Sequence, residues 1–197
     1  YAAHAAESGS APPEVPILFL KTPNTVVGPD DAVTIPRGSK KTDWEAELGL
    51  VIGSAVRRAT PEQADAAIAG YTVVNDVTAR DVQMRHGQWH LGKSFDTFCP
   101  MGPWIATADE LDGRATRVRG WINGELRQDG NTQDMIFDIP TLIETCSRGI
   151  TLVPGDVIAT GTPSGVGMGF KPPKWLKPGD VVRVEIDGIG VLENPVV

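Results

Sequence analysis

The chain has 197 residues, of which 41% are hydrophobic and 22% charged, and it carries a formal net charge of -7. This length and composition predict one globular domain with a sizeable core. The negative charge and the scattered Lys and Arg residues argue against nucleic-acid binding, and the apolar runs are too short to span a membrane. The two cysteines, Cys99 and Cys146, show neither zinc-site spacing nor a disulfide framework, so we expect a cytoplasmic protein with reduced thiols.

The chain opens with an alanine-rich stretch, residues 1–7. If this stretch is helical, His4 and Glu7 lie on one face, because residues three apart are neighbours on a helix. A histidine hydrogen-bonded to a carboxylate can act as a general base. The alternative is a frayed segment without a role in chemistry.

Residues 8–40 are rich in Pro, Gly and Ser, and we expect them to form loops that wrap around a sheet. Within them, the apolar run at 17–20 predicts a buried strand.

Residues 41–53 predict another strand, which carries Glu45 and Glu47 on one face because side chains alternate along a strand. Two adjacent carboxylates repel each other and resist burial, and a divalent cation would relieve both effects. The alternative is that both face solvent.

A capping box at 60–63 predicts the start of a helix, and Gly70 predicts its end. The β-rich run that follows has Asp76 near its end. Together with Glu45 and Glu47, Asp76 would supply three oxygen ligands, which favour Mg²⁺, Mn²⁺ or Ca²⁺ over Zn²⁺ or copper. Asp76 could equally cap a helix.

Two loops contain candidate ligand-binding groups. Residues 85–104 combine Gly and Pro with aromatic residues, which is typical of a loop that folds over a site. Within this loop, Lys93 could neutralise a substrate carboxylate or enolate, or could be a surface lysine. The glycine-rich loop 161–169 could bind an anion through backbone N–H groups, although flexible loops share this composition. A helix at 139–148 among several hairpins completes the expectation of an α+β or mostly β fold.

Five motifs follow one another along the chain: Tyr-x-x-His-x-x-Glu at 1–7, Asp-Trp-Glu-x-Glu-Leu at 43–48, Asn-Asp-Val-Thr-Ala-Arg-Asp at 75–81, Gly-Lys-Ser-Phe-Asp at 92–96, and Gly-Thr-Pro-Ser-Gly-Val-Gly at 161–167. Together they resemble the fumarylacetoacetate hydrolase family, of the C-terminal catalytic domain type. The resemblance implies a single catalytic domain over 1–197, with an active-site lid and wrapping loops within 1–40; family members usually have further residues before the first motif. It also implies an α+β, mostly β fold, in which a mixed sheet rolls into a barrel-like sandwich with a few short helices, commonly in a homodimer.

The resemblance further implies a catalytic site. Mg²⁺ or Mn²⁺ would be bound by Glu45, Glu47 and Asp76. His4 with Glu7 would activate a water molecule, and the opening segment would close over the substrate as a lid.

The substrate-binding residues are implied by the same resemblance. Lys93 would be a catalytic residue that, with Gln83 and Thr162, holds the substrate carboxylate or the developing oxyanion. Tyr1 and Gly161 complete the expected substrate-binding set. The substrate is a small molecule, a 2-oxo acid or a dicarbonyl compound.

Three functions are compatible with these implications. The first is a hydrolase, dependent on Mg²⁺ or Mn²⁺, that cleaves a C–C bond in an acylpyruvate or fumarylpyruvate-like 1,3-dicarbonyl 2-oxo acid. The second is an isomerase or decarboxylase of a 2-hydroxy-dienoate or oxo-diacid in aromatic catabolism, of the 2-hydroxyhepta-2,4-diene-1,7-dioate isomerase or oxaloacetate decarboxylase type. The third is a non-catalytic, metal-dependent protein that binds an oxo acid. We expect residues 85–90 and 127–135 to shape the distal end of the substrate site.

Overall fold

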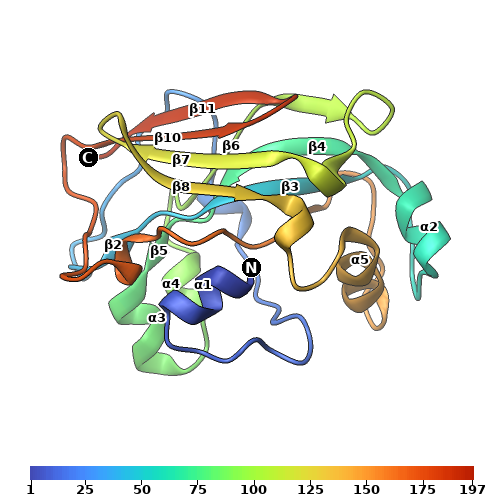
Figure 1. Ribbon diagram of the computed structural model, residues 1–197, viewed down its shortest axis with the longest axis horizontal. Coiled ribbons are helices and arrows are strands. Elements are labelled where there is room, and N and C mark those ends of the chain that lie inside the picture. The colour runs from blue at the N-terminus through green and yellow to red at the C-terminus, as the bar shows by residue number, and fades with distance from the viewer.

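The computed structural model describes residues 1–197, apart from the side chain of His86. Two β-sheets lie one in front of the other, with short helices at their borders (Figure 1). The first sheet has the order β1 (Val26–Val27), β6 (Cys99–Thr107), β4 (Ile68–Asn75), β3 (Ala46–Ile52) and β9 (Val157–Ala159). The second has the order β11 (Gly190–Pro195), β10 (Val181–Ile186), β7 (Arg117–Ile122) and β8 (Glu125–Asn131). A separate short pair joins β2 (Thr42–Asp43) to β5 (Thr78–Ala79).

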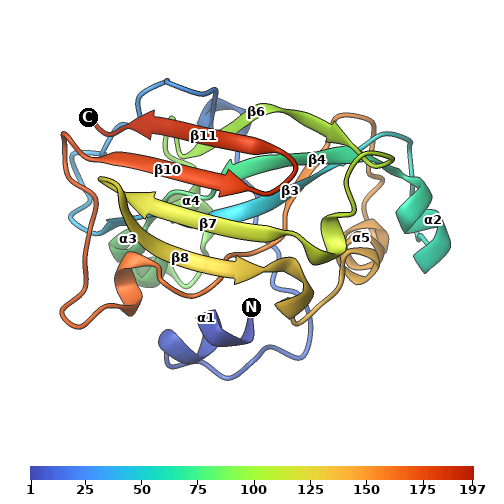
Figure 2. The same ribbon diagram turned by 45° about the horizontal axis from the view of Figure 1, so that its top comes forward.

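The hydrophobic core lies between the two sheets. Figure 2 shows β8, β7, β10 and β11 in front of β3 and β4. Every residue of β3 is buried, because β4 and β9 flank the strand and the second sheet covers it. Leu48 and Val73 of the first sheet belong to one cluster with Val118 and Val184 of the second. This packing places the first residues of β3 deep inside the protein.

The helices are short and stand outside the sheets. The α-helices are α1 (Ala2–Glu7), α2 (Pro61–Ala66), α3 (Arg80–His86), α4 (His90–Lys93) and α5 (Ile139–Ser147). Single turns of 3-10 helix occur at η1 (Pro23–Thr25), η2 (Gly113–Ala115), η3 (Thr132–Asp134) and η4 (Gly167–Gly169). In the described part of the chain, no helix is long and apolar enough to cross a membrane.

The expected α+β, mostly β fold with a mixed sheet is confirmed. β1 pairs with β6 in parallel, whereas β3 pairs with β4 in the antiparallel sense. The capping box at Thr60 is present: its side chain accepts the N–H of Gln63, and the Gln63 side chain accepts the N–H of Thr60. The opening stretch forms α1, so the condition for His4 and Glu7 to share a helix face is met and the frayed alternative is wrong.

Two expected elements are wrong. Gly70 does not end a helix, since α2 ends at Ala66 and Gly70 lies in β4, where a Cβ would collide with the carbonyl oxygen of Ala106 in β6. The apolar run at 17–20 is not a buried strand. Its last carbonyl, of Leu20, accepts hydrogen bonds from side chains of the α4 region instead of from a neighbouring strand. Three of its four side chains are exposed: Ile17, Leu18 and Leu20.

Candidate active site

Three carboxylates meet where β3 begins and β4 ends. The antiparallel register pairs Ala46 with Asn75, so Glu45 and Asp76 lie next to each other just beyond the paired ends. The N–H of Asp76 donates to the carbonyl oxygen of Glu45 at 2.9 Å. One ligand oxygen from each of Glu45, Glu47 and Asp76 lies within 4.8 Å of the others. All three residues are buried, at 4, 3 and 0% exposure, so the solvent-facing alternative for the two glutamates is wrong.

Lysine and arginine side chains surround these carboxylates. The ammonium of Lys93 donates to Oε2 of Glu45 at 2.7 Å and to Oδ2 of Asp76 at 2.6 Å. Lys93 is 2% exposed, so it is not a surface lysine. A second ammonium, from Lys21, donates to the other oxygen of Asp76 at 2.6 Å, and Arg80 donates to Oε1 of Glu45 at 2.5 Å. Both oxygens of Glu45 and both oxygens of Asp76 therefore accept a hydrogen bond from a cationic side chain.

Of the three carboxylates, Glu47 receives the least electrostatic stabilisation from these cations. Burial works to raise the pKa of Glu45, but Lys93, Arg80 and His4 outweigh it and keep that pKa below its ordinary range. Burial, with the charges of Asp76 and Glu45, raises the pKa of Glu47 to about 8. The hydrogen bond that Glu47 accepts from the backbone N–H of Gly161, at 2.8 Å, lowers its pKa too little to compensate.

The carboxylate cluster fits a divalent cation of the hard, oxygen-preferring type. Glu45, Glu47 and Asp76 offer oxygen atoms alone, which suits Mg²⁺ or Mn²⁺ rather than a thiolate- or imidazole-preferring ion. Among the described residues, no Lys or Arg forms an ion pair with Glu47, whereas two cations pair with Glu45 and two with Asp76, so positive charge is missing beside Glu47. A divalent ion would supply that charge, so the three carboxylates fit a binding site for such an ion.

The expected histidine–carboxylate pair is present on α1. Nδ1 of His4 lies 2.8 Å from Oε1 of Glu7, and Oε2 of Glu7 accepts the backbone N–H of Gly165 at 2.9 Å. His4 is close enough to Glu45 for its charge to lower the pKa of that carboxylate. The pair thus stands beside the carboxylate cluster, with the far nitrogen of the imidazole left for another partner.

The structure also places the expected substrate-binding residues near this cluster. Gln83 is buried and accepts a hydrogen bond from Arg80 at 3.1 Å. The hydroxyl of Tyr1 is buried and has no hydrogen-bond partner among the described residues. The hydroxyl of Thr162 donates to the carbonyl oxygen of Ala46 at 2.9 Å, so its proton is already used. Substrate binding by Thr162 and by the other residues stays a prediction.

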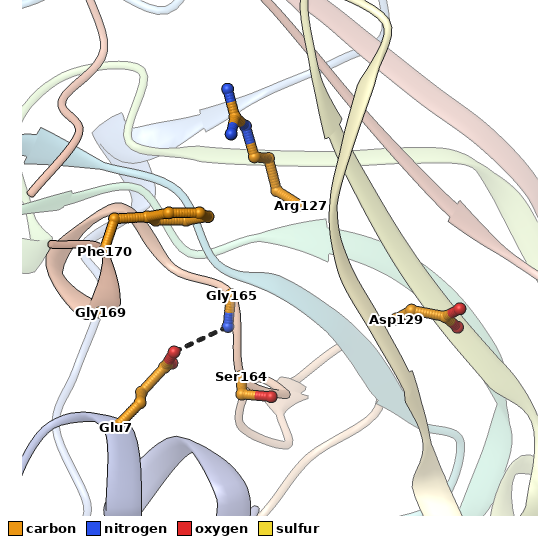
Figure 3. A pocket seen from close by; sticks show the side chains of 7 residues that line it. All are labelled: Glu7, Arg127, Asp129, Ser164, Gly165, Gly169 and Phe170. Atoms are coloured by element: carbon orange, nitrogen blue, oxygen red, sulfur yellow. Dashed lines mark hydrogen bonds between the residues drawn. The ribbon is translucent and has the colours of Figure 1, made fainter.

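A cavity of about 340 Å³ lies beside the histidine–carboxylate pair. In Figure 3, Glu7 reaches from α1 towards Gly165, and the ring of Phe170 lies between the Glu7 carboxylate and the Arg127 side chain. The complete lining consists of Glu7, Arg127, Asp129, Ser164, Gly165, Gly169 and Phe170. Two of these residues belong to the range 127–135, which was expected to shape the distal end of the substrate site.

Sequence reasoning missed three residues of the cluster. Arg80 and Asp43 lie inside recognised motifs, and each could have been noticed as a charged residue next to a predicted ligand. Asp43 is fully buried and accepts a hydrogen bond from Arg80 at 2.9 Å. Lys21 follows the apolar run at 17–20, and no local pattern marks it.

The comparisons with known proteins agree with this geometry. Residues 1–197 match the family model described as fumarylacetoacetate (FAA) hydrolase C-terminal. The chain is 50% identical over 200 residues to the oxaloacetate tautomerase YisK of Bacillus subtilis, covering 100% of this chain and 66% of that protein.

Two crystal structures are similar to the whole fold. The 5-carboxymethyl-2-hydroxymuconate delta-isomerase of Mycobacterium smegmatis has a TM-score of 0.89 and 44% identity, covering 100% of this chain and 75% of that one. The fumarylacetoacetate hydrolase of Exiguobacterium antarcticum has a TM-score of 0.88 and 49% identity, covering 91% of this chain and 65% of that one.

The fold and the comparisons define a class of protein: an enzyme with three buried carboxylates near the start of the buried strand β3. Within this class, the chain belongs to the fumarylacetoacetate hydrolase family. The chain spans 66% of the length of the tautomerase it matches, so the activity of the whole protein is a separate question.

Proposed function

We propose that this chain catalyses proton transfer next to the oxo group of a 2-oxo acid, assisted by a divalent cation. Such a reaction interconverts keto and enol forms or moves a C=C bond. The observation that carries the proposal is the placement of the His4–Glu7 pair beside three buried carboxylates. Two of the similar proteins are named as a tautomerase and an isomerase, which supports this type of reaction.

Glu45, Glu47 and Asp76 would hold the ion, for which we propose Mg²⁺ or Mn²⁺. When bound, the ion supplies the Lewis acidity that polarises the 2-oxo group and stabilises an enolate. Lys93 adds positive charge on the same side, since its ammonium lies against Glu45 and Asp76. The protein groups are therefore arranged for negative charge to develop on the substrate oxygen.

The proton would move through His4. Because Glu7 faces Nδ1 of His4, the tautomer that fits this contact has its proton on Nδ1 and leaves Nε2 as the base. Nε2 takes a proton from the carbon next to the oxo group. It then returns the proton to the oxygen in tautomerisation, or to another carbon in isomerisation. One proton is moved and no group leaves the substrate.

Lys93 and Gln83 are the proposed partners of the substrate carboxylate, with Tyr1, Gly161 and Thr162 completing the binding set. The unpartnered hydroxyl of Tyr1 supports its part, since a buried hydroxyl without a partner is costly. The distal part of the substrate would enter the cavity between Glu7 and Arg127.

Hydrolytic cleavage of a C–C bond is the second candidate, supported by the name of the Exiguobacterium antarcticum relative. In that reaction His4 would take its proton from a water molecule instead of from substrate carbon. The products would then be two acids, whereas tautomerisation and isomerisation conserve the substrate's mass. Decarboxylation would release CO₂, so the three reactions differ in their products.

We also propose that the protein forms a homodimer. The exposed side chains of Ile17, Leu18 and Leu20, at 55, 53 and 66%, lie within four residues of the chain. An exposed apolar stretch of this kind is typical of an interaction surface. The three side chains would be buried against a second copy.

The test is a panel of 2-oxo acids, including oxaloacetate, assayed with Mg²⁺ or Mn²⁺ and followed by enol absorbance and mass spectrometry. We expect proton transfer without loss of mass, and His4→Ala to lower turnover about 10²-fold or more, the usual size of a general-base contribution. Glu110→Ala is the control, because Glu110 is exposed in the turn after β6 and takes no part in the proposed site. Unchanged turnover in His4→Ala would sink the assignment of the base. Binding of oxo acids without any turnover would favour the non-catalytic alternative.

A further inference from the structure

The glycine-rich loop 161–169 does bind anions, but the anions are the protein's own carboxylates. Four backbone N–H groups donate to three carboxylates: Gly161 to Glu47 at 2.8 Å, Gly165 to Glu7 at 2.9 Å, and Gly167 and Met168 to Asp43 at 2.6 and 3.1 Å. These carboxylates come from β3, from α1 and from β2. The loop is thus in contact with the acidic centre at one end and with the helix that carries the base at the other.

Asp43 lies between this loop and the acidic centre. It is 0% exposed, and besides the loop it accepts Nε–H of Arg80 at 2.9 Å. The same guanidinium donates through Nη2 to Oε1 of Glu45 at 2.5 Å. Because a guanidinium is planar and rigid, its contact with Asp43 sets the direction from which it approaches Glu45.

The backbone of the loop approaches two of these carboxylates closely, at Gly167 and Gly169. A Cβ on Gly167 would collide with the carbonyl oxygen of Lys174 and lie 2.7 Å from Oδ1 of Asp43. A Cβ on Gly169 would collide with the carboxylate of Glu7. The backbone therefore packs directly against both carboxylates, so a shift of one is transmitted to the loop and from there to the other.

We propose that Asp43 is a positioning residue that couples α1 to the carboxylates of the metal centre. The connection runs from Glu7 through the loop to Asp43, and from Asp43 through Arg80 to Glu45. This inference rests on the proposed function in one respect, that the carboxylate cluster binds a divalent cation. Asp43 is not part of the cluster of three carboxylates, and both of its oxygens already accept hydrogen bonds. It acts by orienting Arg80 and the loop.

The test uses Asp43→Asn and two measurements that do not depend on turnover. Asn keeps the size of the side chain, but its NH₂ group must face an N–H donor of Arg80, Gly167 or Met168. We expect calorimetric titration to show Mn²⁺ affinity lowered about 10- to 100-fold, the usual effect of losing a partner that orients a ligand. In the wild type, Mn²⁺ should slow amide hydrogen exchange in α1, and this response should disappear in Asp43→Asn.

Asp180→Asn is the matched control. Asp180 accepts hydrogen bonds from Lys177 N and Asn123 Nδ2, at 2.8 and 2.9 Å, and belongs to a turn outside this connection. It should leave both measurements unchanged. If Asp43→Asn does not fold, Arg80→Lys supplies the test, because one ammonium cannot reproduce the fork that joins Asp43 to Glu45.

The outcomes separate this inference from the proposed function. A variant with lower thermal stability, but with wild-type Mn²⁺ affinity and a wild-type exchange response, would overturn the coupling and leave the metal centre intact. A wild type that binds no Mn²⁺ would overturn both. Turnover is not measured, so the identity of the reaction does not affect the result.

Discussion

Replacing Glu47 by Gln separates metal binding from packing at the centre of the site. Glu47 is buried and accepts the N–H of Gly161 at 2.8 Å, and burial with the charges of Asp76 and Glu45 raises its pKa to about 8. At pH 7 the metal-free protein therefore holds this side chain mostly protonated. Gln copies its size, its neutrality and its acceptor oxygen. We expect the metal-free variant to melt near the wild-type temperature below about pH 4.5, where Glu47 is protonated in both the folded and the unfolded chain, and above the wild-type temperature at pH 7.

The metal-bound protein should respond differently. An ion present at 100 times its dissociation constant stabilises the native state by about 2.7 kcal/mol. For a chain of this size, that corresponds to a rise in melting temperature of about 5–10 °C. Glu47→Gln removes one of three charged ligands, so most of this rise should be lost at the same MnCl₂ concentration.

The pH dependence without metal has a definite sign. On folding, the pKa of Glu47 moves from its ordinary value of 4.5 up to about 8. The protonated form is therefore favoured in the folded state, and this contribution is present in full below about pH 4.5 and lost as the pH rises through 8. The wild type should lose stability relative to Glu47→Gln across this interval.

Scanning calorimetry with EDTA or MnCl₂, at about pH 4.5, at pH 7 and above pH 8, measures all three effects. Glu110→Gln is the control, since Glu110 is exposed on a turn after β6 and should change neither response. Equal destabilisation of Glu47→Gln with and without metal would show a packing role instead. A full Mn²⁺-induced rise in the variant would refute the ligand assignment.

Two further predictions concern α1 and the exposed apolar run. Gly169→Ala should displace the Glu7 carboxylate and lower turnover about 10²-fold, with Gly149→Ala, which has open space around it, as control; wild-type turnover would contradict the placement of Glu7. Leu18→Asp should raise the dimer dissociation constant about 10-fold or more in sedimentation experiments, because it places a charge in the proposed interface. Val153→Asp is a control on an exposed residue elsewhere, and an unchanged dimer in Leu18→Asp would exclude this surface.

Short sequence patterns predicted the structure correctly where it depends on residues close together in the chain. The capping box at Thr60 and the His4–Glu7 pair on α1 depend on residues three positions apart, and both are present. Such patterns gave wrong predictions where residues distant in the sequence determine the local structure. Gly70 is required by the close approach of β6, not by a helix end. The run at 17–20 is as apolar as a core strand, yet it belongs to neither sheet and three of its four side chains stay exposed.

By itself, the sequence determined the family, the mostly β fold and three carboxylates for one site, because the motifs carry these residues in order. Only the tertiary structure decided how their charges are balanced. It buries Glu45 against Lys93 and Arg80 while leaving Glu47 without a cation. Partners such as Lys21 lie 55 residues from the carboxylate they contact, and no local pattern encodes such a contact. Burial and charge depend on what the folded chain brings together, which is why the pKa of Glu47 follows from the structure alone.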